Sequence, residues 1–484
     1  MKVNPADGLL RVRPREVGVD ADAVAALLDE AKDAGLDVHS LLVYRSGHLA
    51  VEAYRWPYRS DRPRISHSVT KSFTACAIGL ALEEGRLSLT DTVISFFPEH
   101  LPARVDANLA AMTIQDLLTM RTGHVEETSG SRWRAIETSW IAEFFKIPVV
   151  HKPGTVYVYT SAASYMLSAI VTKVTGQTMH DYLKPRLFEP LDIEGEIWDM
   201  GPEGINPGGN GLSCKVVDLL KLGVLHLQKG MWKGKRVLPE TWVDDATRAY
   251  GDSNYGYHWV TGPEGEFYAM GLFGQLILIS PAYDAVITFT SAINDSMACS
   301  GHLVPLVHRY LSRLFPKHTL NAEDVADARL EARLKKETEV EKLMSLVESR
   351  FEHASILIYN VEENPFGVKA LHLDTSPAVC TFRLIDNEGE YAVTAGIGNW
   401  LEGETDMPGA RLHHGYNLTP LRVVAGGRWL DSDTLELNWI FPETTFRDTV
   451  VCRFAGDRIT VSRRVNVNSG ARQDPDLQGK LISV

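Results

Sequence analysis

ISHSVTKSFT, residues 65–74, places Ser68 three positions before Lys71 at the beginning of an apolar segment. Residues three apart on a helix share a face, so we predict a helix from Ser68 to about Glu84, ended by Gly85, with the serine and lysine side chains adjacent. At a helix start, the backbone N–H of Ser68 would point toward a developing oxyanion, and the helix dipole would help. A lysine in a partly dry site can lose its proton near neutral pH and accept one from a hydroxyl group.

The segment from Ser68 to Lys71 does not decide the chemistry alone. Serine-x-x-lysine occurs by chance about once in a chain of this length, and a helix cap followed by a surface lysine explains it as well as a nucleophile does. The surrounding sequence separates the two interpretations. A hairpin pattern, SLLVYRSGHLAVEAYRW (40–56), precedes the motif, and EEGRLSLTDTVISFFP (83–98) and MTIQDLLTMRTGH (112–124) follow it. In this order the segments resemble the serine β-lactamase and penicillin-binding protein superfamily.

Within this resemblance, PGTVYVYTS (153–161) matches the Tyr-x-Asn element of class C β-lactamases and related esterases, with Ser161 in place of the asparagine. The resemblance implies that Tyr159 shares a proton with Lys71 and passes it to the leaving group. The alternative for Tyr159 is plain packing before the apolar helix predicted over 160–175. The pattern of that helix also matches the superfamily, which favours the catalytic interpretation.

The third element of the superfamily is altered in this chain, which has neither Lys-Thr-Gly nor His-x-Gly. YAMGLFGQ (268–275) instead resembles the G-x-x-G-Q version in the 6-aminohexanoate-dimer hydrolases, the nylon-oligomer hydrolases. That branch implies an oxyanion hole formed by the backbone N–H groups of Ser68 and Leu272. It also implies substrate-binding roles for residues nearby, namely Ser161, Asn210, Gly271 and Phe273. For Asn210, in PGGNGLS, an ordinary turn residue is an equal alternative, and Gly271 also suits a β-bulge.

Charge and cysteine content exclude several classes of protein. The 484 residues carry a formal net charge of −13, whereas nucleic-acid binders usually present a basic surface. No apolar run of about 18 residues occurs, so we expect no membrane span. The first residues lack the apolar core of a signal peptide, which predicts a cytoplasmic protein. Five scattered cysteines without a Cys-x-x-Cys or Cys/His cluster predict reduced thiols, with neither a disulfide framework nor a zinc site.

The order of patterns predicts an α+β domain over 1–320, of the β-lactamase/transpeptidase type that the resemblance implies. It would contain an antiparallel sheet assembled from both chain ends, flanked by helices, and a helical subdomain. The supporting patterns are helices at 21–35 and 214–228, four short strands between Asn254 and Ile293, and an amphipathic helix over roughly 299–315.

The rest of the chain predicts a second, all-β domain. Residues 321–350 are dense in mixed charge and helix formers, which predicts a charged linker helix. Short β-rich runs separated by turns fill 351–484 and predict a small barrel or sandwich, lipocalin-like as in some relatives. We expect this domain either to limit substrate size beside the active-site mouth or to support a homodimer.

The combined motifs predict a serine hydrolase that cleaves a carboxylic ester or a small linear amide through an acyl-enzyme intermediate. Ser68 is the expected nucleophile, Lys71 and Tyr159 move the proton, and no metal or organic cofactor is required. The expected partner is therefore a small-molecule ester or amide, with no nucleic acid and no membrane. β-Lactamase activity is disfavoured because the altered third element lacks the cation that would hold a β-lactam carboxylate, and D-amino-acid peptidase activity is a further alternative.

A non-catalytic binding protein on the same fold is the alternative from another class. The presence of Ser68, Lys71 and Tyr159 together argues against it, because a chain without catalysis would tolerate the loss of any one of them. Three histidines near the motifs have no catalytic assignment. His124 is expected to be structural, and His67 and His258 are left without a role.

Overall fold

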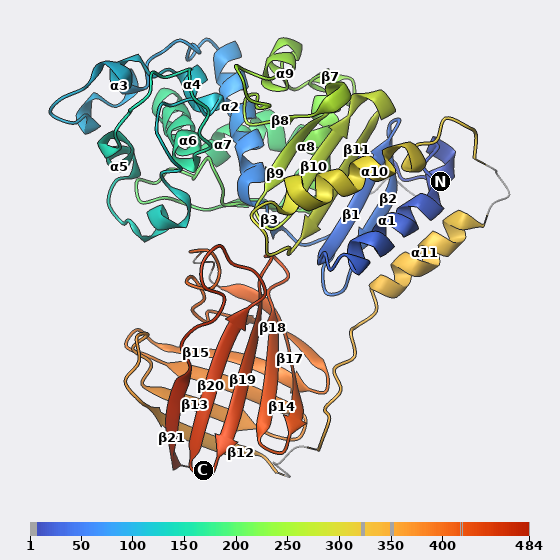
Figure 1. Cartoon of the computed structure of the whole chain (residues 1–484), viewed down its shortest axis with the longest axis vertical. Helices are drawn as coiled ribbons and strands as arrows, with labels where there is room; N and C mark the ends of the chain where they lie inside the picture. The colour runs from blue at the N-terminus through green and yellow to red at the C-terminus, as the bar shows by residue number, and fades with distance from the viewer. Residues whose placement is uncertain (1–6, 321–324, 349–352, 417, 419, 484) are drawn as a thin grey trace. The chain divides into compact units, whose positions relative to one another are not determined.

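The predicted hairpin forms one edge of a six-stranded antiparallel sheet in the computed structural model, which describes residues 7–320, 325–348, 353–416, 418 and 420–483. The strand order is β2-β1-β11-β10-β9-β8 (Figure 1). The strands are β1 Val38–Arg45, β2 His48–Tyr54, β8 Val260–Thr261, β9 Phe267–Gly271, β10 Gln275–Ser280 and β11 Ala285–Ser291. Because β1 pairs with β11, Leu41 lies opposite Phe289. The predicted assembly of the sheet from early and late segments is confirmed.

Helices cover both faces of this sheet because its strands carry apolar side chains on both sides. Successive side chains of a strand point to opposite faces. Ile277 and Ile279 of β10 accordingly belong to one buried cluster, whereas Leu276 and Leu278 belong to another. The covering helices are α8 Val216–Leu227 on the first face, and α1 Ala21–Asp33 and α10 Val304–Leu314 on the second (Figure 1).

The helix that carries Lys71 is α2, Thr70–Glu83, and every residue from Thr70 to Ala81 is buried. A helix that is apolar nearly all round belongs in a core, and α2 packs against α6 and α7. Helix α6 ends at Gly176 in the left-handed conformation, as its pattern predicts. The other helices of this region are α3 Ala107–Ala111, α4 Ile114–Leu118, α5 Trp140–Lys146, α6 Ser161–Thr175, α7 Met179–Leu183 and α9 Glu240–Ala246.

Short strands complete the first part of the chain. A three-stranded sheet, β3-β5-β4, contains the residues directly before the Ser68 segment, and β6 and β7 form a small hairpin. Their bounds are β3 Arg64–Ile65, β4 Ile197–Trp198, β5 Leu212–Cys214, β6 Met231–Trp232 and β7 Lys235–Arg236.

The predicted helix over 299–315 is divided in the structure. Ala298–Leu303 form a π-helical turn, and α10 begins at Val304. Pro305 has no amide hydrogen to donate, so the α-helical bonding pattern is interrupted before it.

The charged segment over 321–350 contains α11, Ala326–Glu337, whereas 338–348 form no helix and 321–324 and 349–350 lie outside the described residues. Arg329 of α11 pairs with Asp22 of α1 at 2.9 Å, and Leu330 is buried in the cluster that α1 shares. Packing thus groups α11 with the first unit, which comprises 1–55 and 59–337, while 56–58 and 338–484 form the second. The domain boundaries at 320 and 350 stay predictions.

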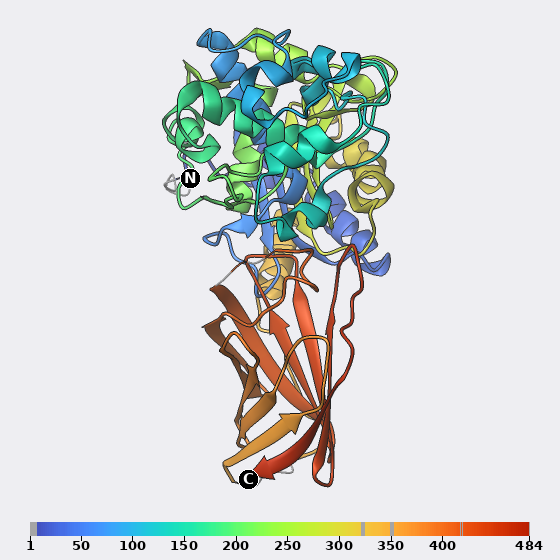
Figure 2. The same ribbon diagram turned by 90° about the vertical axis from the view of Figure 1, so that its left-hand side faces the viewer.

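The second unit is a closed antiparallel barrel. Its strands follow the order β15-β14-β13-β12-β21-β20-β19-β18-β17-β16. Pairing of β12 with β21 joins its two ends, and a short parallel pairing of β15 with Gly426 and Gly427 of β17 closes the ring, whose strands curve in Figure 2. The strands are β12 Ser355–Val361, β13 Ala370–Thr375, β14 Val379–Ile385, β15 Glu390–Ile397, β16 Trp400–Thr405, β17 Leu421–Asp431, β18 Thr434–Ile440, β19 Arg447–Ala455, β20 Arg458–Val465 and β21 Leu477–Ser483.

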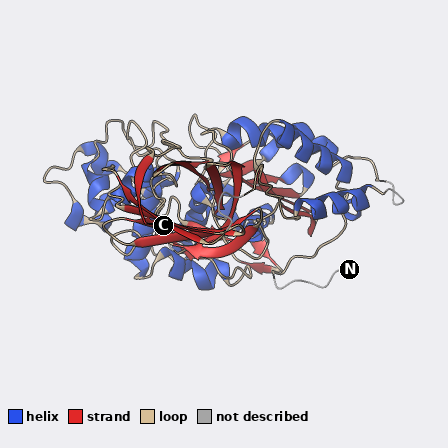
Figure 3. Ribbon diagram, turned by 90° about the horizontal axis from the view of Figure 1, so that it is seen from below, coloured by secondary structure: helices blue, strands red, loops and turns tan. Residues whose placement is uncertain are grey.

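Burial alternates along most of these strands, as in β14, where every second side chain is buried. That period of two is the pattern of a strand with one face toward a core. All the helices and strands of this unit that the structure describes, from β12 to β21, are strands, and Figure 3 colours helices and strands apart, so the predicted α+β fold followed by an all-β domain is confirmed. None of the helices that the structure describes combines the length and apolarity needed to cross a bilayer. All five cysteines are buried and unbridged.

Candidate active site

A sharp turn after β3 presents Ser68. Ser66 is fixed to β5 because its N–H and its Oγ both donate to the carbonyl of Leu212, at 2.9 and 2.8 Å. His67 then adopts a left-handed backbone with φ of 48°, a conformation uncommon outside glycine. Ser68 follows in a 3-10 turn that leads into α2, so the α-helix begins two residues later than predicted. The side chain of Ser68 lines a cavity of about 200 Å³.

Lys71 is buried beside this serine. Its Nζ lies 3.0 Å from Oγ of Ser68, 3.0 Å from Oγ of Ser161 and 2.8 Å from the carbonyl oxygen of Gly209. Burial lowers the pKa of Lys71 from 10.5 to about 7, and the charge of Glu127 opposes this shift. Near neutral pH a large fraction of the amine is therefore unprotonated, and a neutral amine can accept a proton from the adjacent hydroxyl group.

Tyr159 lies on the other side of the amine. The Nζ of Lys71 is 4.8 Å from the centroid of the Tyr159 ring, which meets the Tyr255 ring edge to face. Burial raises the pKa of Tyr159 above its ordinary value, and a hydrogen bond between its hydroxyl group and Ser68 opposes the rise. The phenol is thus neutral at physiological pH and is placed to exchange a proton with the serine.

Ser161 and Glu127 extend the network beyond the three motif residues. The Oγ of Ser161 accepts a hydrogen bond from Lys71 and donates one to Oε1 of Glu127 at 3.3 Å. Sequence reasoning missed Glu127. The only signal for it was a pair of acids after the Thr-Gly-His turn, and nothing in that pair shows that one of them faces Lys71.

The cavity brings together five of the predicted site residues: Ser68, Lys71, Tyr159, Gly271 and Leu272. Its remaining lining is aromatic, apolar or weakly polar: Tyr255, His258, Val260, Tyr268, Met270, Ser296, Cys299 and Ser300. A Cβ added to Gly271 would lie 2.6 Å from the carbonyl oxygen of Ser66. The missing side chain therefore lets β9 pass directly against the turn that presents Ser68.

Asn210 and Phe273 lie outside the residues that line this cavity. The Oδ1 of Asn210 accepts a hydrogen bond from Arg134 at 2.7 Å, and Arg134 also pairs with Asp199 at 3.0 Å. Phe273 is buried with φ of 61° and packs edge to face on His67 at 5.4 Å. Both residues therefore support the loops around the site in this structure, and direct substrate contact by either stays a prediction.

The two other histidines are buried and neutral. Burial and the charge of Lys71 lower the pKa of His258 to about 3, and its Nε2 lies 3.0 Å from Oγ of Ser164. Burial lowers the pKa of His124 to about 4, and its Nδ1 lies 2.8 Å from Oγ1 of Thr122. Among the described residues, no three His, Cys, Asp or Glu side chains are grouped as metal ligands would be.

The Beta-lactamase family model matches residues 24–307, which is more than half of the chain and includes every residue of this cavity. The chain belongs to the beta-lactamase family. As a member of this family it is a serine hydrolase, and the resemblance identified from the motifs is confirmed.

Relatives of this beta-lactamase-family chain include hydrolases of esters and amides. It is 25% identical over 313 residues to the 6-aminohexanoate-dimer hydrolase of Paenarthrobacter ureafaciens, a match that covers 58% of this chain and 80% of the relative. It is 26% identical over 208 residues to esterase EstB of Burkholderia gladioli, covering 37% of this chain and 53% of the relative. Among solved structures, EstCE1, a hydrolase with promiscuous acyltransferase activity, superimposes with a TM-score of 0.51 at 17% identity, over 60% of this chain and 98% of that one.

Proposed function

We propose that this beta-lactamase-family hydrolase cleaves carboxylic esters and small linear amides through an acyl-enzyme formed on Ser68. The observation that carries the proposal is the 3.0 Å separation between Nζ of Lys71 and Oγ of Ser68, in a site that lowers the lysine pKa to about 7. A serine hydroxyl is a weak nucleophile until an adjacent base removes its proton. An amine that is partly neutral at pH 7 is such a base.

Acylation begins when Oγ of Ser68 attacks the substrate carbonyl carbon and its proton passes to neutral Lys71. The carbonyl oxygen becomes an oxyanion, which the backbone N–H groups of Ser68 and Leu272 stabilise. When the intermediate collapses, the bond to the leaving alcohol or amine breaks. Lys71, now an ammonium, returns the proton through the Tyr159 hydroxyl group to that leaving group. The products of this step are the free alcohol or amine and the ester of Ser68.

In deacylation, the acyl group passes from Ser68 to water. Water takes the place of the leaving group, loses a proton to the Tyr159 and Lys71 pair, and adds to the acyl carbon. Collapse breaks the bond to Oγ of Ser68, which recovers the proton, and the carboxylic acid departs. The charge of Lys71 thus appears and disappears once in each half of the cycle.

The charges around the cavity favour esters and linear amides over penicillins. Of the described residues that line it, only Lys71 is a lysine or arginine, and His258 is neutral because its pKa is lowered to about 3. The strand beside the nucleophile carries Met270, Gly271 and Leu272, none of which bears a charge. A β-lactam carboxylate would therefore enter the cavity without a partner, which is costly. The ester and amide hydrolases among the relatives support the same preference.

The proposal is tested by labelling and by substrate competition. A fluorophosphonate probe should modify Ser68 of the full chain, identified by mass spectrometry of its peptides. Ser68→Ala should abolish both labelling and hydrolysis of p-nitrophenyl butyrate, whereas Ser95→Ala, the same change at an exposed serine, should alter neither. Nitrocefin and ampicillin should turn over more slowly than short-chain esters and an uncharged linear amide. Labelling of a different residue, or faster turnover of nitrocefin than of every ester and amide, would overturn it.

A further inference from the structure

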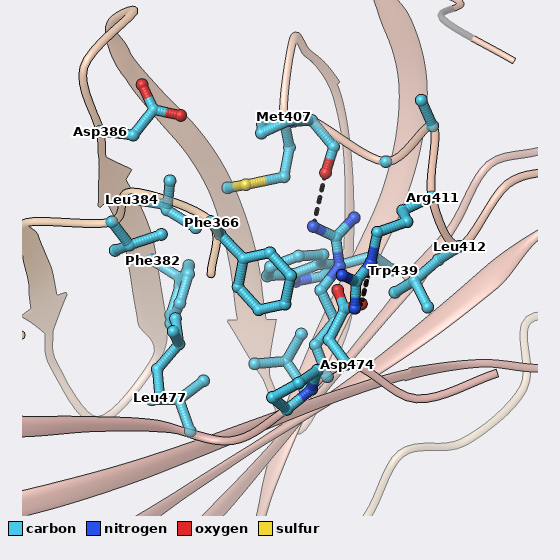
Figure 4. A pocket seen from close by; sticks show the side chains of 18 residues that line it. Phe366, Phe382, Leu384, Asp386, Met407, Arg411, Leu412, Trp439, Asp474 and Leu477 are labelled. Carbon is cyan, nitrogen blue, oxygen red and sulfur yellow. Dashed lines mark hydrogen bonds and ion pairs between the residues drawn. The ribbon is translucent and has the colours of Figure 1, made fainter. Parts of the chain in front are cut away.

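The barrel contains a second cavity, of about 280 Å³ and partly open, lined by residues of its own strands and loops (Figure 4). Most of the lining is aromatic or aliphatic, including Phe366, Phe382, Leu384, Met407, Trp439 and Leu477. Protein interiors are packed closely enough that such voids are rare, and a ring of eight strands is only just filled by its own side chains. The larger ring here leaves unfilled space. By comparison with an apolar cavity of ~150 Å³ that holds benzene, it has room for roughly ten to fifteen non-hydrogen atoms.

The two arginines of the lining are already neutralised. Arg411 pairs with Asp474, its Nη2 2.6 Å from Oδ1, and its guanidinium group lies 4.3 Å from the centroid of the Phe366 ring. Arg463 pairs with Asp448, its Nη2 2.6 Å from Oδ2, and donates to the carbonyl of Pro408 at 2.6 Å. Neither cation has to find a counterion in a ligand.

The carboxylates in and beside the cavity also have partners. Asp448 is fully buried, and His413 and Arg463 outweigh the effect of burial and lower its pKa, so the carboxylate stays ionised and cancels the arginine. Asp386 accepts hydrogen bonds from the backbone N–H groups of Glu388 and Gly389. A charged ligand would therefore have to displace an existing partner or lie unpaired in an apolar space, and both are unfavourable.

A neutral polar group of the described lining has neither a hydrogen bond nor an ion pair. The indole N–H of Trp439 is buried and makes no hydrogen bond to any residue that the structure describes. An indole nitrogen can only donate, and buried donors are nearly always paired. A ligand that carries a hydrogen-bond acceptor would satisfy it.

We propose that the barrel is a binding site for one neutral, mainly apolar small molecule that carries a carbonyl-type acceptor for the Trp439 N–H. The site is distinct from the cavity at Ser68, because its lining residues all lie between 366 and 477. Its ligand class is set by size, by the ion pairs that already engage the two arginines of the described lining, and by the unused indole donor.

The test uses a matched pair of ligands with the same fused rings and the same number of non-hydrogen atoms: 2-acetonaphthone, a neutral ketone, and 2-naphthoate, a carboxylate. Isothermal titration of the full chain should show saturable one-to-one binding of the ketone and at least tenfold weaker binding of the carboxylate. Equal affinity for both, or no saturable binding of the ketone up to its solubility limit, would overturn the proposal.

Barrel variants locate the site. Val461→Phe and Val368→Phe each add a ring at a buried lining position and should weaken ketone binding at least tenfold, with unchanged circular dichroism and ester hydrolysis. Two positions are used because, if one variant fails to fold, the other still tests the site. Trp439→Phe should weaken 2-acetonaphthone more than 2-ethylnaphthalene, which has no acceptor. Ketone binding that survives a correctly folded filling variant, or equal weakening of both ligands by Trp439→Phe, would contradict the assignment.

A variant at Asp474 tests whether the ion pairs of the lining explain the preference for a neutral ligand. Asp474→Asn keeps the shape of the side chain but leaves Arg411 without its carboxylate. The preference for ketone over carboxylate should then fall at least tenfold, because 2-naphthoate can take the place of Asp474. An unchanged preference would show that the ion pairs do not set the ligand class.

Discussion

The Oγ of Ser161 lies 3.0 Å from Nζ of Lys71 and 3.3 Å from Oε1 of Glu127, so one hydroxyl group links the buried amine to an exposed carboxylate. The amine of Lys71 is thus under the influence of a charge at the protein surface. We therefore expect the protonation of Lys71 to be sensitive to a residue that solvent and salt can reach.

The rate of ester hydrolysis should depend on the protonation of Lys71. Neutral lysine is the active form in the proposed mechanism, so kcat/KM should rise with pH through an apparent pKa of about 7. The charge of Glu127 raises the lysine pKa, so Glu127→Gln should move this limb to lower pH, by about 0.5 unit at low ionic strength. Glu126→Gln, the same change at the neighbouring exposed acid, should leave the profile in place. A shift to higher pH in Glu127→Gln would contradict an electrostatic role.

Burial of Lys71 should also appear in folding stability. With a pKa of about 7 in the fold and 10.5 as a free lysine, this residue binds fewer protons folded than unfolded between those values. Its contribution to the free energy of unfolding therefore rises with pH across that window. Lys71→Met has no ionisable group at this position. Its free energy of unfolding should therefore exceed that of the unmodified chain by the largest amount below pH 7. Urea unfolding should show that advantage shrinking by about 2 kcal/mol between pH 6.5 and 9. A difference that does not vary with pH would contradict the shifted pKa.

Lys71 and Tyr159 should behave as one proton-transfer unit. Lys71→Met and Tyr159→Phe should each slow acylation by about 10²–10⁴-fold. Groups that act together are not additive, so the double variant should be roughly as slow as the slower single one. Pre-steady-state release of p-nitrophenol measures the acylation step. Losses in log rate that sum in the double variant would show that the two side chains act independently.

Gly271 should be required for the close approach of β9 to the serine turn. In Gly271→Ala the new Cβ would lie 2.6 Å from the backbone oxygen of Ser66, so the strand or the turn must shift. We expect a loss of about 1–3 kcal/mol in stability and at least a tenfold loss in kcat. Gly403→Ala, at a strand glycine of the barrel with nothing within 4 Å of the added Cβ, is the control and should change neither. Thermal unfolding and ester kinetics measure both effects.

The sequence patterns predicted those features that depend on residues close together along the chain. The three-residue spacing of Ser68 and Lys71 placed both side chains at one site because helical geometry fixes it. The hairpin and the late strands followed from alternating apolar residues. Two strands of the barrel carry weaker patterns: β13 contains a histidine and an aspartate, and β16 has exposed polar side chains around Gly403.

The contact of Asn210 with Arg134 and that of Lys71 with Ser161 were not predictable in this way. Asn210 bonds to Arg134, which lies 76 positions earlier, and the amine meets Ser161 90 positions later. Such contacts depend on how helices and loops pack, and no periodicity in the sequence encodes them. The role of Glu127 belongs to the same class, because its effect on Lys71 depends on a loop conformation.

The pairing of β1 with β11 has a consequence for how the enzyme is made. The hydroxyl groups of Ser40 and Thr290 meet at 2.5 Å across 250 residues of sequence, so the sheet is joined by one pairing of very large sequence separation, a kind of contact that forms slowly. During translation, β1 has left the ribosome long before its partner strand exists, and its apolar edge is open until then. The Ser68 turn rests on β9, which arrives almost as late. We therefore expect the chain to acquire activity only after β9 to β11 have left the ribosome, and its early strands to be prone to aggregation until then.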